Sequence, residues 1–337
     1  MSLLFIPFQA LLLAAYFCIT SGVPGYPSTM VSTFSKSLLP AKDDFSTGIN
    51  TQKMKKMENH NPEFRPLQTV RGVTGGSGLV YHEKKLYILS DDSDFLFGYN
   101  LHGNQLEKVS LKDSGTPGQV MKKHLKPDFE AIAATPDRYF IFGSGSAENR
   151  FDMVELDADL KFISRSSLSA LYRNIMHQTG INEQNFNIEG VIVKGPDAYF
   201  FNRGNGPQKQ NGIIIVKNWR GTSYQIEKFI PIDLPTRDGF AFTFSDAILL
   251  EDSIYFLATA EKTTSVYDDG EILGSALGVL ALRSLEMTDF HFLTKDYKLE
   301  GITFQYKQAG RLHFLISEDA DNSEGGTTLF QLSLEAR

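Results

Sequence analysis

The chain has 337 residues, enough for one large domain or two small ones, and its 42% hydrophobic and 22% charged residues are typical of a globular protein rather than a disordered one. A net charge of −7 without any basic stripe argues against a nucleic-acid partner. Cys18 is the only cysteine, which excludes disulfides within the chain and thiolate zinc sites, and the seven histidines show no zinc-hydrolase spacing.

An apolar run over residues 3–20 stands at the N-terminus. It is compatible with a signal peptide, a membrane anchor or a start codon assigned too early, because no Lys or Arg precedes Lys36 to form a charged n-region. We treat residues 1–22 as an apolar leader and 23–65 as a disordered linker. Export to the periplasm or medium is slightly favoured. A start near Met54 would instead predict a cytoplasmic protein, and membrane contact is expected only through a retained leader.

Five segments then repeat one pattern: a small or acidic residue, a short apolar strand, a turn and an aromatic-rich strand. They cover residues 75–92, 128–145, 187–204, 244–261 and 299–319. The equivalent positions are Ser77, Glu130, Glu189, Asp246 and Glu300, spaced by 53, 59, 57 and 54 residues. A near-constant period of this length is typical of repeat architectures such as propellers.

Two further alternating or β-branched runs follow the strand pair in each of the first four segments, so each unit is expected to be a four-stranded antiparallel meander. The last unit has only three strands, and residues 66–73 can supply the fourth, which would close a ring. We therefore predict an all-β fold, a five-bladed β-propeller over residues 66–337 closed by an N-terminal strand. A two-domain sandwich does not explain the period. A six-bladed ring would need a blade in residues 168–186, which look helical or irregular.

In such a ring the start of each inner strand and the end of the second strand meet at one mouth of the channel. Four blades place a carboxylate there: Glu130, Glu189, Asp246 and Glu300. Converging carboxylates require a cation, protonation or a basic side chain, and hard oxygen ligands suit Ca²⁺. We predict that these four residues hold Ca²⁺. In the alternative interpretation, each carboxylate caps backbone N–H groups of the neighbouring blade and does no chemistry.

Loops at the same mouth carry candidate substrate-binding residues. They are Asp91, Asp92, Arg150, Arg203, Asn205, Lys262, Glu318 and Asp319. Ser77 and Ser146 do not fit the G-x-S-x-G pattern, so a serine nucleophile is not expected. We expect a small-molecule ligand and a monomer.

A repeated E-[AG]-[IV] step begins three of the inner strands, at Glu130, Glu189 and Glu300. Through this step the chain resembles the propellers of the "esterase-like activity of phytase" group and uncharacterised bacterial propellers of the DUF6929 type. The resemblance covers residues 66–337. It implies calcium at the channel mouth and a hydrolase acting on a small phosphoester, ester or lactone, although Ser77 replaces a carboxylate in the first unit. The alternative is a non-catalytic propeller that binds a small ligand or peptide, and the sequence does not decide between the two.

Overall fold

The computed structural model describes residues 62–103, 105–113, 126–265, 270–320 and 326–336. The predicted leader, 1–22, and the predicted linker up to residue 61 lie outside these residues. Within the described part of the chain, every helix is too short or too polar to cross a membrane.

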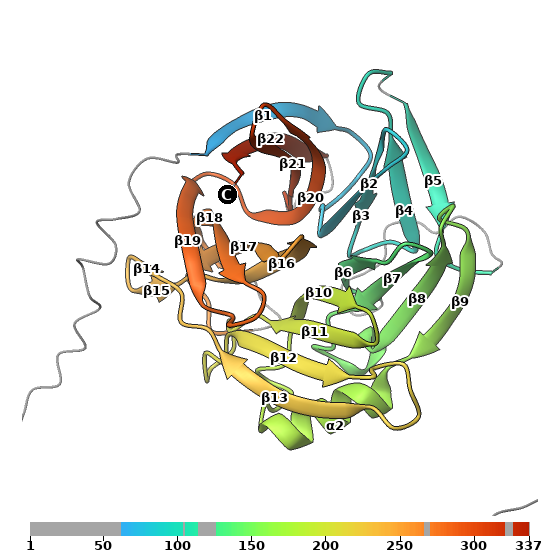
Figure 1. The fold of residues 1–337 in the computed structure, drawn as a ribbon, viewed down its shortest axis with the longest axis vertical. Coiled ribbons are helices and arrows are strands. Elements are labelled where there is room, and N and C mark those ends of the chain that lie inside the picture. The colour runs from blue at the N-terminus through green and yellow to red at the C-terminus, as the bar shows by residue number, and fades with distance from the viewer. Residues whose placement is uncertain (1–61, 104, 114–125, 266–269, 321–325, 337) are drawn as a thin grey trace, which may run out of the picture. The chain divides into compact units, whose positions relative to one another are not determined.

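Five four-stranded antiparallel sheets are arranged around a central axis as the blades of a β-propeller (Figure 1). The first blade contains β2 (Gly78–His82), β3 (Lys85–Leu89), β4 (Phe95–Tyr99) and β5 (Leu106–Ser110). The second contains β6 (Phe129–Ala134), β7 (Arg138–Gly143), β8 (Asp152–Asp157) and β9 (Phe162–Ser167). The third contains β10 (Ile188–Lys194), β11 (Asp197–Asn202), β12 (Gly212–Lys217) and β13 (Gln225–Pro231). The fourth contains β16 (Thr243–Leu250), β17 (Ser253–Glu261), β18 (Ile272–Ala281) and β19 (Met287–Thr294).

The fifth blade joins the two ends of the propeller. Its strands are β20 (Leu299–Gln308), β21 (Arg311–Glu318), β22 (Thr327–Glu335) and β1 (Glu63–Val70), with β1 at the outer edge. The five-bladed fold and its closure by an N-terminal strand are thus confirmed. The strand begins three residues before the predicted start at residue 66 because Phe64 stacks on Phe330, with ring centroids 4.8 Å apart, and extends the pairing with β22.

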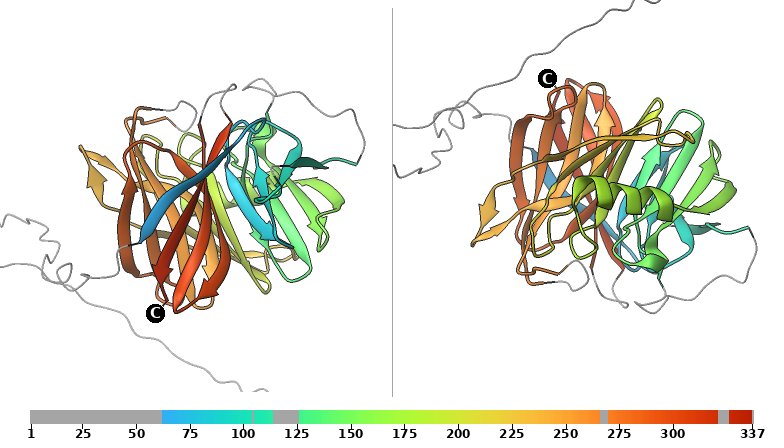
Figure 2. Two further views of the ribbon diagram at one scale, coloured as in Figure 1. Left: turned by 90° about the horizontal axis from the view of Figure 1, so that it is seen from above. Right: turned by 90° about the horizontal axis from the view of Figure 1, so that it is seen from below.

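The segment considered for a sixth blade forms a helix instead. α2 (Ser169–Thr179) ends at Gly180, whose φ of 73° is the left-handed conformation that glycine adopts at little cost. The helix lies outside the ring beside β13 (Figures 1 and 2). Two short elements complete the described part of the chain: a 3₁₀ turn, η1 (Glu148–Arg150), and a hairpin of β14 (Thr236–Arg237) and β15 (Phe240–Ala241).

Aromatic and aliphatic side chains fill the spaces between neighbouring blades. Phe142 of the second blade, for example, meets Phe200 and Trp219 of the third at centroid distances of 5.8 and 5.6 Å. These contacts hold the inner strands β2, β6, β10, β16 and β20 next to one another around the axis. Because all five inner strands run in the same direction, one mouth of the channel collects their first residues and the other collects their last.

Candidate functional site

The mouth at the starts of the inner strands carries three buried glutamates. In β6, β10 and β20 the strand register skips one residue, and the skipped residues are Glu130, Glu189 and Glu300. Such bulges re-aim a side chain out of the regular alternation of a strand. Only 9%, 3% and 3% of the surfaces of these residues are exposed, so the repeat places three carboxyl groups in equivalent buried positions.

The fourth predicted carboxylate, Asp246, does not occupy the equivalent position. In β16 the register skips Ser245, which therefore corresponds to the three glutamates, and its hydroxyl donates to the Leu299 carbonyl at 2.7 Å. The two oxygens of Asp246 accept hydrogen bonds from the backbone N–H groups of Ala247 at 2.7 Å and Ile302 at 2.8 Å. Asp246 thus caps the neighbouring inner strand, which is the alternative role considered for all four residues.

A first group of charges, here called the arginine cluster, consists of Arg203, Glu189, Glu261, Glu300 and Lys298. The Arg203 guanidinium lies 3.3 Å from Glu189, 3.0 Å from Glu261 and 3.8 Å from Glu300. Lys298 approaches Glu300 to 3.0 Å. Burial raises the pKa of both Glu189 and Glu300, although Arg203 and Lys298 oppose the shift. The cluster binds three blades together through fully desolvated charge pairs.

A second group, here called the aspartate cluster, consists of Asp91, Asp128 and Glu130. One carboxylate oxygen from each lies within 4.8 Å of the others. Lys126 forms ion pairs with Asp91 and, at 3.0 Å, with Asp128, and Arg150 donates to Asp128 at 2.7 Å. Burial on its own would lower the pKa of Lys126, but the two aspartates outweigh it and raise this pKa.

Backbone hydrogen bonds hold Asp128 in a conformation that few residues adopt. Its φ of 54° lies in the left-handed region, where aspartate is one of the better tolerated residues. Its N–H donates to the Asp91 carbonyl at 3.1 Å, and its own carbonyl accepts from the Ser144 N–H at 2.9 Å. The Ser144 hydroxyl also donates to the Asp128 carboxylate. The first two blades therefore fix the direction of this carboxylate from both sides.

Glu130 differs from every other carboxylate of the mouth. No hydrogen bond or ion pair joins its side chain to another residue in the part of the chain that the structure describes. Burial, together with the charges of Asp128 and Glu189, raises its pKa well above the usual range of a glutamate. A buried carboxyl group without a partner is costly and is the feature expected where a ligand completes a site.

Asp91 also has a strongly shifted pKa. Burial raises it to about 7, with Lys126 opposing the shift and the negative charges of Asp319 and Asp128 adding to it. Asp91 and Asp319 approach each other over Gly75, where a Cβ atom would lie 3.2 and 3.0 Å from their oxygens. The glycine therefore permits two carboxylates of adjacent blades to come close, and Lys298 neutralises Asp319 at 2.9 Å.

The charges of the mouth do not balance. The described residues of the two clusters and their immediate partners provide four bases, which are Lys126, Arg150, Arg203 and Lys298. They provide seven acids, which are Asp91, Asp128, Glu130, Glu189, Glu261, Glu300 and Asp319. If all were ionised, the net charge would be 4 − 7 = −3. Among the described residues, this excess of negative charge can be offset by protonation or by a bound cation.

Four of the predicted binding residues make their contacts away from the clusters. The Asp92 carboxylate accepts from the Thr74 and Ser90 hydroxyls, both at 2.7 Å, and the Asn205 amide donates to the Ser265 carbonyl at 3.2 Å. The exposed Lys262 pairs with Glu271 at 2.6 Å. The half-buried Glu318 side chain is hydrogen-bonded to Thr328. The other predicted residues, Asp91, Arg150, Arg203 and Asp319, lie in the clusters or pair with them.

Sequence reasoning missed Lys126, Asp128, Glu261 and Lys298. Two of them carry a simple signal: Asp128 and Lys298 stand two residues before Glu130 and Glu300, and a period of two directs side chains to the same side of a strand. Asn187 has the same relation to Glu189 and donates to it at 2.6 Å. Glu261 is the last residue of β17, at the end of a second strand.

Comparison with known proteins gives a family but no activity. The sequence model described as "Family of unknown function (DUF6929)" matches residues 72–334. No curated protein matches the chain.

Several solved structures are distantly similar to this chain. The PQQ-bound aldose sugar dehydrogenase of Streptomyces coelicolor is 11% identical with a TM-score of 0.46, covering 82% of this chain and 99% of its own. A luciferin-regenerating enzyme is 8% identical with a TM-score of 0.43, covering 82% and 98%. The glutaminyl cyclase of Myxococcus xanthus is 12% identical with a TM-score of 0.42, again covering 82% and 98%. These identities and scores are too low to assign an activity to this chain, and the phytase-like resemblance stays a prediction.

Proposed function

Because the chain belongs to the DUF6929 family, whose function is unknown, we propose a function from the site alone: the propeller binds a divalent cation, Ca²⁺, at Asp91, Asp128 and Glu130. The observation that carries this proposal is Glu130, a buried carboxylate without a partner among the described residues and within 4.8 Å of two others. A cation there would also offset the negative charge of the mouth.

The donor set favours calcium. The cluster offers carboxylate oxygens, which are hard ligands, and contains neither histidine nor cysteine. Calcium accepts six to eight oxygens in flexible geometries, so backbone carbonyls and water can complete the coordination that three carboxylates begin. Lys126 lies between Asp91 and Asp128, where an ion would also bind, so the ammonium group and the ion compete for these two residues.

For the chemistry at the site, we propose hydrolysis of a small phosphoester, ester or lactone. A calcium ion would polarise the substrate oxygen and lower the pKa of a bound water. Asp91, with a pKa of about 7 in the ion-free site, can exchange a proton near neutral pH. A non-catalytic site that binds a small ligand or peptide is the second candidate. It is favoured by one observation: Arg150, Arg203 and Lys298 are already paired with carboxylates and are not available to hold a transition-state charge.

Calorimetric titration with CaCl₂ tests the cation site. Wild-type protein should bind the ion, and its melting temperature should rise, by an amount that corresponds to about 2.7 kcal/mol at a hundredfold excess over the dissociation constant. Glu130→Gln keeps the shape but removes the charge, and should weaken binding at least about tenfold. Glu286→Gln, at an exposed glutamate in the turn between β18 and β19, is the matched control. Equal affinities for both variants, or no heat and no thermal shift in the wild type, would exclude the site.

Turnover is tested separately with p-nitrophenyl phosphate, p-nitrophenyl acetate and a γ-lactone. Hydrolysis that needs Ca²⁺ and is lost in Glu130→Gln supports the hydrolase. Calcium binding without any turnover supports the non-catalytic candidate.

A further inference from the structure

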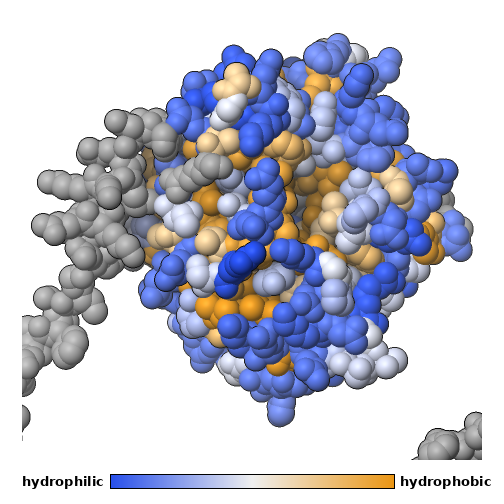
Figure 3. All heavy atoms as spheres, in the orientation of Figure 1, coloured by the Kyte–Doolittle hydropathy of each residue, from blue (hydrophilic) through white to orange (hydrophobic). Residues whose placement is uncertain are grey.

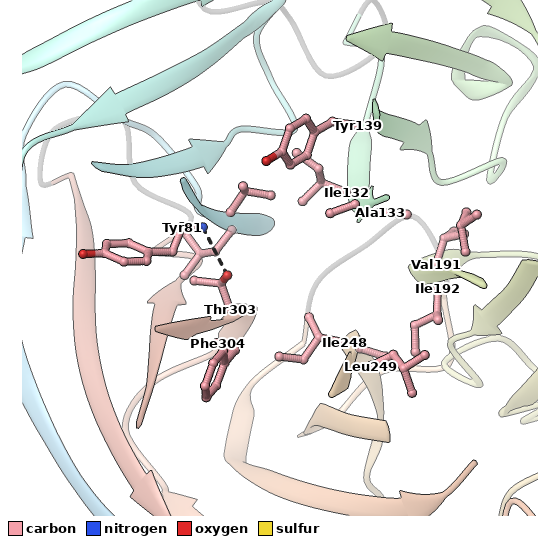
Figure 4. A pocket seen from close by; sticks show the side chains of 15 residues that line it. Tyr81, Ile132, Ala133, Tyr139, Val191, Ile192, Ile248, Leu249, Thr303 and Phe304 are labelled. Carbon is pink, nitrogen blue, oxygen red and sulfur yellow. Dashed lines mark hydrogen bonds between the residues drawn. The ribbon is translucent and has the colours of Figure 1, made fainter. Parts of the chain in front are cut away.

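The opposite mouth of the channel holds a cavity of about 200 Å³ at the ends of the inner strands. All five inner strands contribute to its wall, with branched aliphatic side chains such as Ile132, Ile192 and Ile248 around the hollow (Figure 4). On the face of the molecule that Figure 3 shows, hydrophobic side chains are visible in the central part, where hydrophilic ones partly cover them, and hydrophilic side chains predominate around the edge. This cavity lies away from the charged clusters.

The charge of the wall limits what can bind. None of the residues that line the cavity is charged. An ionised ligand would lose part of its hydration there without gaining a partner of opposite charge from these residues. The wall therefore favours an occupant that is neutral in the part that enters the cavity.

A few polar groups converge on the same space. Tyr139 lines the cavity, and its hydroxyl is hydrogen-bonded to His82 Nδ1 at 3.0 Å. The Thr303 hydroxyl accepts a hydrogen bond from the Tyr81 N–H at 3.2 Å, which leaves its own hydrogen to donate (Figure 4). The inner strands are also the end strands of their sheets, so one backbone edge of each faces the channel without a strand partner. The side chains of the wall are mostly apolar, while backbone groups and hydroxyls give it a polar surface of about equal extent. A small-molecule site combines these two features, because apolar side chains supply contact and polar groups fix the orientation of the ligand.

The volume sets the size of the ligand. An engineered apolar cavity of about 150 Å³ is large enough for benzene. A cavity of about 200 Å³ therefore holds one aromatic ring or a compact pair of fused rings. We propose that this mouth of the channel binds a small, uncharged aromatic molecule that carries one hydrogen-bonding group, such as an indole or a phenol.

Titration of the full-length protein with indole tests this site, using calorimetry and ligand-observed NMR. Indole should bind, and tryptamine, which adds an ammonium group to the same ring system, should bind at least about tenfold more weakly. Absence of indole binding at concentrations of about 10 mM, or equal affinity for the two compounds, would overturn the proposal.

Two variants locate the binding. Ala134 lines the cavity and is itself exposed, so Ala134→Trp should fill the space without disturbing the core and weaken indole binding at least about tenfold. Ile248→Trp should block the cavity from another strand, and it replaces Ala134→Trp in the experiment if that variant does not fold. Ile163→Trp, on the outer strand β9 and 43% exposed, is the matched control and should bind indole as the wild type does. Unchanged affinity in a folded blocking variant would place the binding elsewhere and refute the site.

Discussion

The two mouths of the channel are built by the same five inner strands, yet one gathers buried charges and the other gathers aliphatic side chains. At the first mouth, Glu130, Glu189 and Glu300 occupy bulges at the strand starts. At the second, residues such as Ile132 and Ile192 follow in the same strands only two or three positions later. A propeller thus turns a short polar-to-apolar sequence step, repeated in each blade, into two chemically different sites on one axis.

Both mouths depend on a closed ring of blades. Removing β1, which closes the ring, should therefore have the largest effect on stability and on ligand binding. Deleting residues 1–61 leaves every described residue in place and should not change the unfolding midpoint in urea. Deleting residues 1–70 removes Phe64 and the buried Val70 and exposes the edge of β22. We expect a loss of several kcal/mol, on the scale of the whole stability of a domain, together with loss of the indole and calcium responses. Equal midpoints for the two truncations would contradict the closure.

The second test affects only the charged mouth. Arg203→Met should destabilise the protein by about 3–5 kcal/mol, because Glu189, Glu261 and Glu300 would lose a shared buried cation. Lys262→Met removes an exposed pair with Glu271 and should cost less than about 1 kcal/mol. Chemical denaturation measures both. A small loss for the Arg203 variant would show that the carboxylates of this mouth are already protonated.

These charges also show how far the sequence alone leads. The period of the repeats and the three strands of the last unit predicted the five blades and the closing strand, because strand patterning is local. Asp246 was misaligned by one residue, since a bulge shifts the register without a sequence marker and only the pairing identifies Ser245 as the equivalent residue. Lys126 and Glu261 were missed because each pairs with a residue of another blade, Asp91 and Arg203 respectively, and contacts between blades depend on side-chain geometry.

A third test separates capping from cation binding at the charged mouth. Asp246→Ala removes the acceptor for the buried N–H groups of Ala247 and Ile302 and should cost about 1–3 kcal/mol. The calcium affinity should stay within about twofold of the wild type, because Asp246 lies outside the aspartate cluster. If Asp246→Ala abolishes the calorimetric signal while the protein remains folded, the four-residue site expected from the sequence is the correct one.

The smallest expected effect is a pH dependence that belongs to the charged mouth alone. Burial raises the pKa of Asp91 to about 7, above the value near 3.9 expected in the unfolded chain. Between these values the folded protein keeps a proton that the unfolded chain has released, so the free energy of unfolding falls as the pH rises. The contribution of this Asp91 proton to the free energy of unfolding is fully present below about pH 4 and is lost above about pH 7. In EDTA, the melting temperature should therefore drop by about a few degrees from pH 5.5 to pH 8.

Two comparisons assign this slope to the site. Asparagine does not titrate, so the melting temperature of Asp91→Asn should depend less on pH over the same range. Saturating Ca²⁺ in the wild type should reverse the slope, because a bound ion favours the ionised carboxylate and lowers its pKa in the folded state below that of the unfolded chain. A slope that persists in Asp91→Asn and does not respond to Ca²⁺ would assign the pH dependence to the other carboxyl groups whose pKa burial raises, which are Glu130, Glu189 and Glu300. Asp91 would then have to be regarded as ionised and neutralised by Lys126.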